Sequence, residues 1–357
     1  MKMPSVLFLG CLALAGWLSG AALVQGAPVP YGLLKSIPVG GEGGWDYLEV
    51  DPAAHRLYVS HATKVVVIDT ATDTVVGEVA GTPGVHGIAV APELGRGFTS
   101  NGRENKVGIF DLKTLQPIGK VETGENPDAI LYESKRAEVY AFNGRSHSAT
   151  VIDARAAKVL ATIPLGGKPE FAVEDAEQDR IFVNIEDTSE LVAIDAAKHE
   201  VAARWPIAPG EEASGLAIDV KHHRLFLGCA NKLMVMLDDT TGKVVGSVPI
   251  GAGVDACKFD PETQLAFASC GDGTTTIARE DKSGALTVVQ TLKTARGART
   301  MALDPATHKI YLSAAEYPAG TEGERRPRVV AGSFKVLVFG PEHGEVLESR
   351  PVGEKAN

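Results

Sequence analysis

Seven polar positions recur at nearly equal distances along the chain, and their side chains are of types that bind ligands or assist reactions. In chain order they are Asp46, His86, Asp128, Glu170, Ser214, Asp255 and Arg299. Carboxylates, an imidazole and a guanidinium that met around one cavity would form a site for a small polar ligand or a divalent metal ion. If they only border a wet opening, their polarity serves solvation. The elements that position them decide between these interpretations.

A divalent metal ion is the only cofactor that these residues suggest. His61 lies near Asp46 in the sequence and adds a second imidazole, so the predicted metal ligands are Asp46, His61 and His86. Imidazole and carboxylate ligands suit zinc, copper or manganese. No short motif such as His-x-x-x-His accompanies them, and the metal therefore remains a hypothesis.

An internal repeat places these residues. The intervals between successive positions are 40, 42, 42, 44, 41 and 44 residues. Each unit opens with an apolar stretch that ends in an acidic or proline-containing turn, as in residues 47–52, and a second stretch with a central aromatic residue follows. A period near 40 with four short strands is typical of a propeller blade. The sequence predicts an all-β fold, a seven-bladed β-propeller with four antiparallel strands per blade.

The innermost strand of a propeller blade lines the central channel. Because the recurring positions lie just before the first strand of each unit, we expect their side chains to ring one mouth of that channel. His61 follows the second strand and is expected near the same rim. The predicted ligand-binding residues are therefore Asp46, His61, His86, Asp128, Glu170, Asp255 and Arg299.

The repeat also separates scaffold from candidate site, because a residue that every blade needs should appear in every blade. An aromatic residue occupies the second strand of all seven units and is expected in the core: Tyr58, Phe98, Tyr140, Phe182, Phe226, Phe267 and Tyr311. An aspartate ends the third strand of five units and is expected to bond with its own turn: Asp69, Asp111, Asp153, Asp195 and Asp238.

Three features depart from the repeat. Blade six has Thr-Thr-Ile-Ala-Arg-Glu at residues 275–280, without the usual Ile-Asp ending of the third strand. Residues 316–328 are an insertion in blade seven; either they fold over the mouth, where their arginines would complement the carboxylates, or they stay apart from it. The fourth-strand pattern occurs once too often, at residues 34–40 and 346–353, and either copy fits the outer edge of blade seven.

Residues 1–26 resemble a signal peptide, with Lys2, an apolar stretch at 6–23 and small residues before Ala27. A retained signal anchor is the alternative. We therefore expect residues 27–357 to form one periplasmic or secreted domain, with no membrane span after cleavage. The formal net charge of −10 makes nucleic acid an unfavourable partner. Cys229 and Cys270 occupy equivalent positions in neighbouring blades, too far apart for a disulfide, and are expected to be free thiols.

The repeat resembles the YVTN-repeat β-propellers of the YncE type. The resemblance is carried by Arg-Leu-Tyr-Val-Ser at 56–60, Val-Val-Val-Ile-Asp-Thr-Ala-Thr at 65–72 and Ile-Pro-Leu-Gly at 163–166, and it covers roughly residues 33–353. It implies an exported seven-bladed propeller. Some members of that family are described as binding single-stranded DNA and many are not, so the resemblance implies shape and location more than chemistry.

Three functions fit these observations. The first is an exported, monomeric, non-catalytic binding or scaffold module that presents the polar mouth to a small molecule or an envelope protein. The alternative is a metal-assisted hydrolase or lactonase, in which a metal held at the mouth activates water. Single-stranded DNA binding rests on the resemblance alone. The sequence has no Gly-x-Ser-x-Gly elbow, dinucleotide fingerprint or phosphate loop, which favours the binding module.

Overall fold

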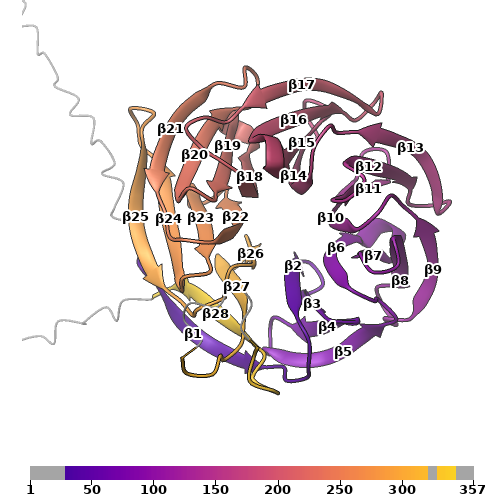
Figure 1. Cartoon of the computed structure of the whole chain (residues 1–357). Helices are drawn as coiled ribbons and strands as arrows, with labels where there is room; N and C mark the ends of the chain where they lie inside the picture. The colour runs from indigo at the N-terminus through magenta and orange to yellow at the C-terminus, as the bar shows by residue number, and fades with distance from the viewer. Residues whose placement is uncertain (1–28, 321–327, 343–357) are drawn as a thin grey trace, which may run out of the picture.

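Seven four-stranded antiparallel sheets surround a central axis (Figure 1). The computed structural model describes residues 29–320 and 328–342. In six sheets the strands follow chain order from the axis outward, because each short turn joins neighbouring antiparallel strands. The predicted seven-bladed β-propeller is confirmed.

The blades have the following strands. Blade one contains β2 (Trp45–Asp51), β3 (Arg56–His61), β4 (Lys64–Asp69) and β5 (Thr74–Ala80). Blade two contains β6 (Val85–Ala91), β7 (Arg96–Asn101), β8 (Lys106–Asp111) and β9 (Pro117–Glu122). Blade three contains β10 (Pro127–Glu133), β11 (Glu138–Asn143), β12 (Ser148–Asp153) and β13 (Lys158–Pro164). Blade four contains β14 (Pro169–Asp175), β15 (Arg180–Ile185), β16 (Glu190–Asp195) and β17 (Glu200–Pro206).

Blade five contains β18 (Ala213–Asp219), β19 (Arg224–Cys229), β20 (Leu233–Asp238) and β21 (Val244–Pro249). Blade six contains β22 (Val254–Asp260), β23 (Leu265–Cys270), β24 (Thr274–Glu280) and β25 (Leu286–Lys293). Blade seven contains β26 (Met301–Asp304), β27 (Lys309–Ala314), β28 (Lys335–Pro341) and β1 (Tyr31–Pro38). Short 3-10 turns lie at η1 (Pro92–Leu94), η2 (Glu186–Thr188) and η3 (Val220–His222).

The N-terminal strand closes the ring. β1 pairs antiparallel with β28 and forms the outer edge of blade seven, with Tyr31 opposite Pro341 and Ile37 opposite Val336. This decides between the two predicted closing strands in favour of the N-terminal copy; the other, at residues 346–353, lies outside the described residues. The side chain of Gln290 on blade six holds the backbone of Tyr31 at both its N–H and its carbonyl, at 2.9 and 2.8 Å.

The aromatic residues of the second strands fill the core. All seven are at most 2% exposed, which confirms the prediction. Apolar clusters cross the blade boundaries: one joins Ile37, Val336 and Val338 of blade seven to Leu48 and Val59 of blade one. Each sheet thus buries its faces against its neighbours, as expected of a propeller.

The aspartates at the ends of the third strands stabilise turns, as predicted. Asp69 accepts from the N–H groups of Ala71 and Thr72 at 3.0 and 2.8 Å, and Asp111, Asp153, Asp195 and Asp238 make equivalent bonds. In blade six, β24 extends through Glu280, and Asp281 accepts from the N–H groups of Ser283 and Ala285. The turn aspartate is therefore displaced along the chain in this blade.

Among the described residues, no helix is long and apolar enough to cross a membrane. The predicted signal peptide lies outside the described residues, as do positions 321–327 of the blade-seven insertion. Two contacts of Glu316 hold the base of that insertion. The N–H of Val330 donates to the Glu316 carbonyl at 2.8 Å, and the Lys335 ammonium lies 3.0 Å from the Glu316 carboxylate.

Shortening Ile37 tests the ring closure. Ile37 is 2% exposed in the cluster between blades seven and one, so Ile37→Ala should lower the free energy of unfolding by about 2–5 kcal/mol. Urea denaturation measures the loss. Leu33→Ala on the same strand is the control, since Leu33 is 58% exposed and its loss should stay within about 0.5 kcal/mol. Equal losses in both variants would contradict the closure by β1.

Candidate functional site

Irregular strand pairing aims the recurring residues into the mouth. In blades one to six the ladder between the first and second strands is interrupted at the recurring position, for example between Trp45 and Leu48 in blade one. Such bulges redirect a side chain and end local pairing. The N–H of Asp46, freed from the ladder, donates to the Ser60 hydroxyl at 2.8 Å.

Second-strand polar residues support the mouth from behind. The Ser100 hydroxyl accepts from Gly87 at 2.8 Å and donates to the carbonyl of Asp128 in the next blade. The Ser269 hydroxyl donates to the carbonyl of Arg299 in the same way, and Asn184 donates to the carbonyl of Ser214 at 3.2 Å. Sequence reasoning missed these residues, although the Ser or Asn two places after the second-strand aromatic was a visible signal.

Three neighbouring blades contribute the tightest cluster of the mouth. His86 Nδ1 lies 2.6 Å from Asp46 Oδ2 and 3.5 Å from Asp128 Oδ1. Ligand atoms of these three residues all lie within 4.8 Å of one another. The predicted pairing of Asp46 with His86 is therefore present, and Asp128 is the third member.

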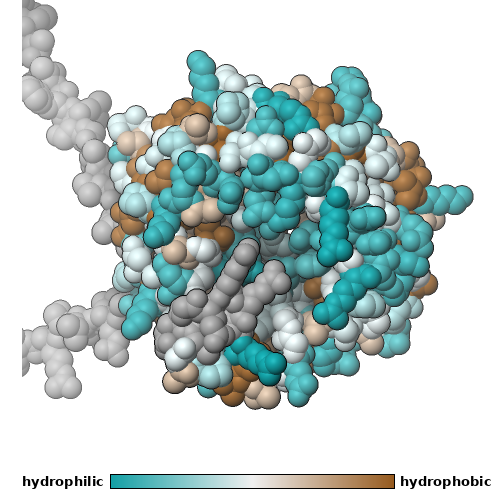
Figure 2. Space-filling view, viewed as in Figure 1, coloured by the Kyte–Doolittle hydropathy of each residue, from teal (hydrophilic) through white to brown (hydrophobic). Residues whose placement is uncertain are grey.

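The rest of the mouth contains two further clusters of oppositely charged side chains. The Lys168 ammonium lies 3.1 Å from Glu170 and also contacts Glu186, and Arg299 Nε lies 3.2 Å from Asp255 Oδ2. The ion-paired groups of the mouth thus comprise five carboxylates and three cations. Around the centre of the ring, the face in Figure 2 is mostly hydrophilic.

Burial and crowding shift the protonation of the mouth. Burial raises the pKa of Asp128 to about 8, with the charges of Asp46 and Glu170 adding to the effect and His86 opposing it. Burial likewise raises the pKa of Glu170 and of Asp255, each to about 7. Burial lowers the pKa of His86, but the hydrogen bond with Asp46 and the nearby carboxylates outweigh it and raise the pKa to about 9. The mouth therefore holds protons that its carboxylates would release in water.

Two aromatic rings from blades one and four meet across the channel. Tyr47 of blade one and Phe171 of blade four have ring centroids 5.0 Å apart, and Lys258 of blade six lies 5.0 Å over the Phe171 ring. Both aromatics directly follow a recurring position, where the other blades have Gly87, Ala129, Gly215, Ala256 and Thr300. Sequence reasoning missed this contact, which narrows the channel where the two rings meet.

His61 is not among the residues that the structure gathers at the mouth. It is 1% exposed, its ring stacks on Phe334 at 4.4 Å, and burial lowers its pKa. His61 pairs in register with Trp45, and successive residues of a strand point to opposite faces. Its side chain therefore faces the boundary with blade seven. The third member of the cluster with Asp46 and His86 is Asp128, whereas the sequence predicted His61.

The predicted free thiols are present. Cys229, Cys257 and Cys270 are free and buried, as expected for the first and last. Burial raises the pKa of Cys229 and Cys270 to about 12.

The blade-seven insertion starts beside the channel. At its start, the Tyr317 ring lies 5.0 Å from Arg296, which is close in sequence to Arg299. The insertion therefore begins near the mouth; its residues Arg325 and Arg326 lie outside the described residues.

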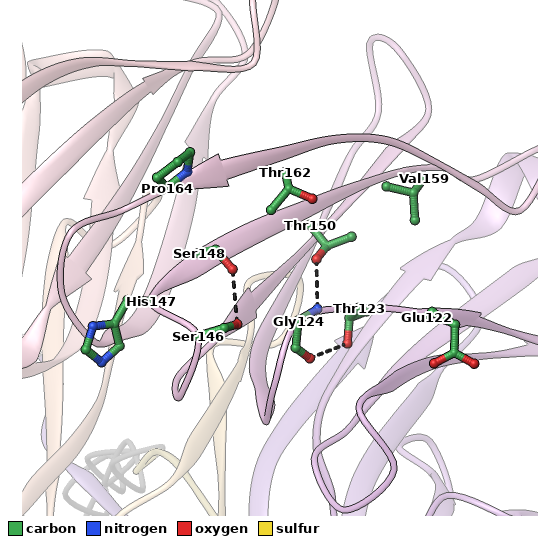
Figure 3. A pocket seen from close by; sticks show the side chains of 10 residues that line it. All are labelled: Glu122, Thr123, Gly124, Ser146, His147, Ser148, Thr150, Val159, Thr162 and Pro164. Carbon is green, nitrogen blue, oxygen red and sulfur yellow. Dashed lines mark hydrogen bonds between the residues drawn. The ribbon is translucent and has the colours of Figure 1, made fainter.

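A second hollow lies between blades two and three, away from the channel (Figure 3). It has a volume of about 470 Å³ and is lined by hydroxyl groups, among them those of Thr123, Ser146 and Thr150. The Thr150 hydroxyl accepts from the N–H of Gly124 at 3.3 Å, and the Ser146 and Ser148 hydroxyls lie 3.2 Å apart. Among its lining residues Glu122 pairs with Lys106 at 2.8 Å, whereas the mouth brings together several carboxylates and cations; the mouth therefore remains the candidate site.

The pH dependence of stability tests the His86 ion pair. A pKa raised to about 9 means that protonated His86 stabilises the folded state fully below its ordinary value near 6.5 and loses that contribution as the pH rises through about 9. His86→Gln should therefore cost about 1–3 kcal/mol at pH 6 and much less at pH 10, measured by urea denaturation. Exposed His55 provides the control variant, His55→Gln. An equal cost of His86→Gln at both pH values would refute the assignment.

Comparison with known proteins supports the architecture. No family model and no curated protein matches the chain. Solved structures that match include "Structure of U3-55K" (TM-score 0.71, 8% identity, covering 85% of this chain and 97% of that chain). "Crystal structure of RRP9 WD40 repeats" matches with TM-score 0.72, 9% identity and 88% and 99% coverage. "Crystal Structure of Mitotic Checkpoint Complex" matches with TM-score 0.72, 13% identity and 94% and 99% coverage. The chain shares the fold of these propellers, and the YncE-type resemblance stays a prediction.

Proposed function

We propose that the protein is an exported, non-catalytic binding module whose channel mouth takes a small cationic ligand. The observation that carries the proposal is the imbalance of the ion-paired groups at the mouth, five carboxylates against three cations. A bound cation would offset this excess in a partly buried setting, where charge interactions are stronger than in water.

The shape of the mouth supports a small ligand. Tyr47 and Phe171 meet across the channel, so a ligand would enter and leave by the mouth. The supporting residues Ser60, Ser100 and Ser269 fix the backbone behind it. Little reorganisation would then accompany binding, which favours affinity.

The signal-peptide pattern and the YncE-type resemblance support export. The proposed protein is also a monomer. An envelope protein that presents a lysine or arginine side chain is a partner of the same chemistry. Nucleic acid is outside the proposal, because an acidic mouth repels phosphate groups.

Cation binding should release protons. Because burial and neighbouring carboxylates raise the pKa of Asp128 to about 8, a cation bound near pH 7 would displace protons, and the measured heat should change with the ionisation enthalpy of the buffer. Isothermal titration with Mn²⁺ and with putrescine tests this. Asp128→Asn and Asp255→Asn should each weaken the bound probe at least about tenfold.

Glu78→Gln is the matched control, because Glu78 is 53% exposed and pairs with Lys64 on the outside of blade one. It should leave affinity unchanged. Failure of both probes to bind, or binding that neither mouth variant weakens, would refute the proposal.

A metal-assisted hydrolase is the second candidate, favoured by the Asp46, His86 and Asp128 cluster. Two carboxylates and an imidazole fit a divalent metal ion, which when bound would lower the pKa of a coordinated water. Glu170, whose pKa burial raises to about 7, is suited to accept a proton near neutral pH.

This candidate predicts hydrolysis of a simple lactone in the presence of Mn²⁺ or Zn²⁺. Glu170→Gln should lower the rate about 100-fold or more, and Glu78→Gln should not. A wild-type rate no higher than that of the free metal ion would exclude the hydrolase.

A further inference from the structure

A second group of metal-ligating side chains lies between blades four and five. Asp175 ends β14 of blade four, and His223 and Asp239 belong to turns of blade five. Ligand atoms of the three residues lie within 4.8 Å of one another. The side chains of Asp175 and Asp239 are buried, whereas that of His223 is 49% exposed. The group is thus mostly enclosed but reachable from solvent through the imidazole.

The Gln178 amide occupies the middle of this group. Its Nε2 lies 2.8 Å from Asp175 Oδ2, 3.2 Å from Asp239 Oδ1 and 3.3 Å from His223 Nδ1. An amide NH₂ has two hydrogens to donate, and here it faces three potential acceptors. Three atoms that could bind a metal ion thus surround the Gln178 amide nitrogen, whose hydrogens carry only a partial positive charge.

One carboxylate oxygen in this enclosed group lacks a partner. Asp239 Oδ2 is buried and makes no hydrogen bond, on a side chain that is 0% exposed. A buried polar atom without a partner is costly. Burial raises the pKa of Asp239, and the charge of Asp175 adds to the effect. A cation bound between Asp175 and Asp239 would offset the buried negative charge of both carboxylates.

The repeat shows that the scaffold does not require this arrangement. In five blades the residue after the turn aspartate donates its N–H to the carbonyl of a residue in the left-handed conformation between the first and second strands. These pairs are Thr70 with His55, Leu112 with Gly95, Ala154 with Ala137, Ala196 with Asp179, and Asp239 with His223. Among these five pairs, the blade-five pair alone has two residues that readily bind a metal.

Asp175 is both scaffold and candidate ligand. Its Oδ1 accepts from the N–H groups of Glu177 and Gln178 at 3.0 and 3.1 Å, the turn bonds that Asp51 and Asp260 also make. Its Oδ2 faces the group. Glu170 is the second residue of β14 and Asp175 the last, and five residues at about 3.3 Å each put the two about 16 Å apart. The group therefore lies at the opposite end of the blades from the mouth.

We propose that Asp175, His223 and Asp239 bind a divalent transition-metal ion, Mn²⁺ or Zn²⁺, that links blades four and five. Two carboxylates and an imidazole are ligands that these ions accept. Tetrahedral ligands at about 2.1 Å from zinc lie about 3.4 Å apart, and His223 Nδ1 is already 3.2 Å from Asp239 Oδ1. The Gln178 amide turns aside when the ion enters, and any proton on His223 Nδ1 leaves to solvent.

The test uses the full chain with Asp128→Asn, which disables the mouth cluster so that any tight ion reports on the group between the blades. Native mass spectrometry after equilibration with Mn²⁺ or Zn²⁺, and thermal unfolding with the ion or with EDTA, should show one bound ion and a higher Tm. Adding Asp239→Ala should weaken binding at least tenfold and abolish the rise in Tm. Gln178→Ala should preserve binding.

Alanine at position 239 is compatible with folding, because Ala154 and Ala196 occupy equivalent positions. Asp239→Asn, which keeps the side-chain shape, should lose the ion as well. The matched control is His308→Ala: His308 has the same left-handed conformation and lies 2.7 Å from Asp260 of the preceding blade. It should leave metal binding unchanged. Absence of a bound ion in Asp128→Asn, or an ion that Asp239→Ala retains, would overturn the proposal.

Discussion

Mutual burial of neighbouring sheets is the constraint on which this molecule depends. A four-stranded sheet has two faces to cover and no layer of its own to cover them, so each blade completes the core of the next. The second-strand aromatics supply much of the buried volume, and the turn aspartates fix the corners at which the chain reverses. Since the ring must close, the last blade borrows its outer strand from the beginning of the chain.

This division of labour explains why the mouth can carry so much charge. The core lies between the blades, and the bulges in the inner strands turn Asp46, His86 and Asp128 away from it toward the axis. Backbone support from second-strand hydroxyls holds those positions. The carboxylates of the mouth thus lie in a partly wet place outside the apolar core, where their mutual repulsion is balanced by protons and by His86, Lys168 and Arg299.

The sequence predicted the fold and most of the mouth, because a period near 40 residues and a recurrent aromatic can be recognised from the sequence alone. It misplaced His61, because the direction of a side chain at the end of a strand depends on the strand register and on a bulge, and no single residue type indicates either. The Tyr47–Phe171 contact was missed because it joins residues of blades one and four, which are far apart in the sequence. Asp239 was missed because, one place beyond a turn aspartate, it resembles ordinary turn polarity.

The closure by β1 also governs when the molecule can exist in its finished form. Tyr31 leaves the ribosome some three hundred residues before Pro341, its partner in the outer edge of blade seven, and pairings of such long range form late. Until then the nascent chain has an unfinished seventh sheet and two uncovered blade faces. A chain of this design therefore stays open during synthesis and becomes a closed ring only after its last blade has been made.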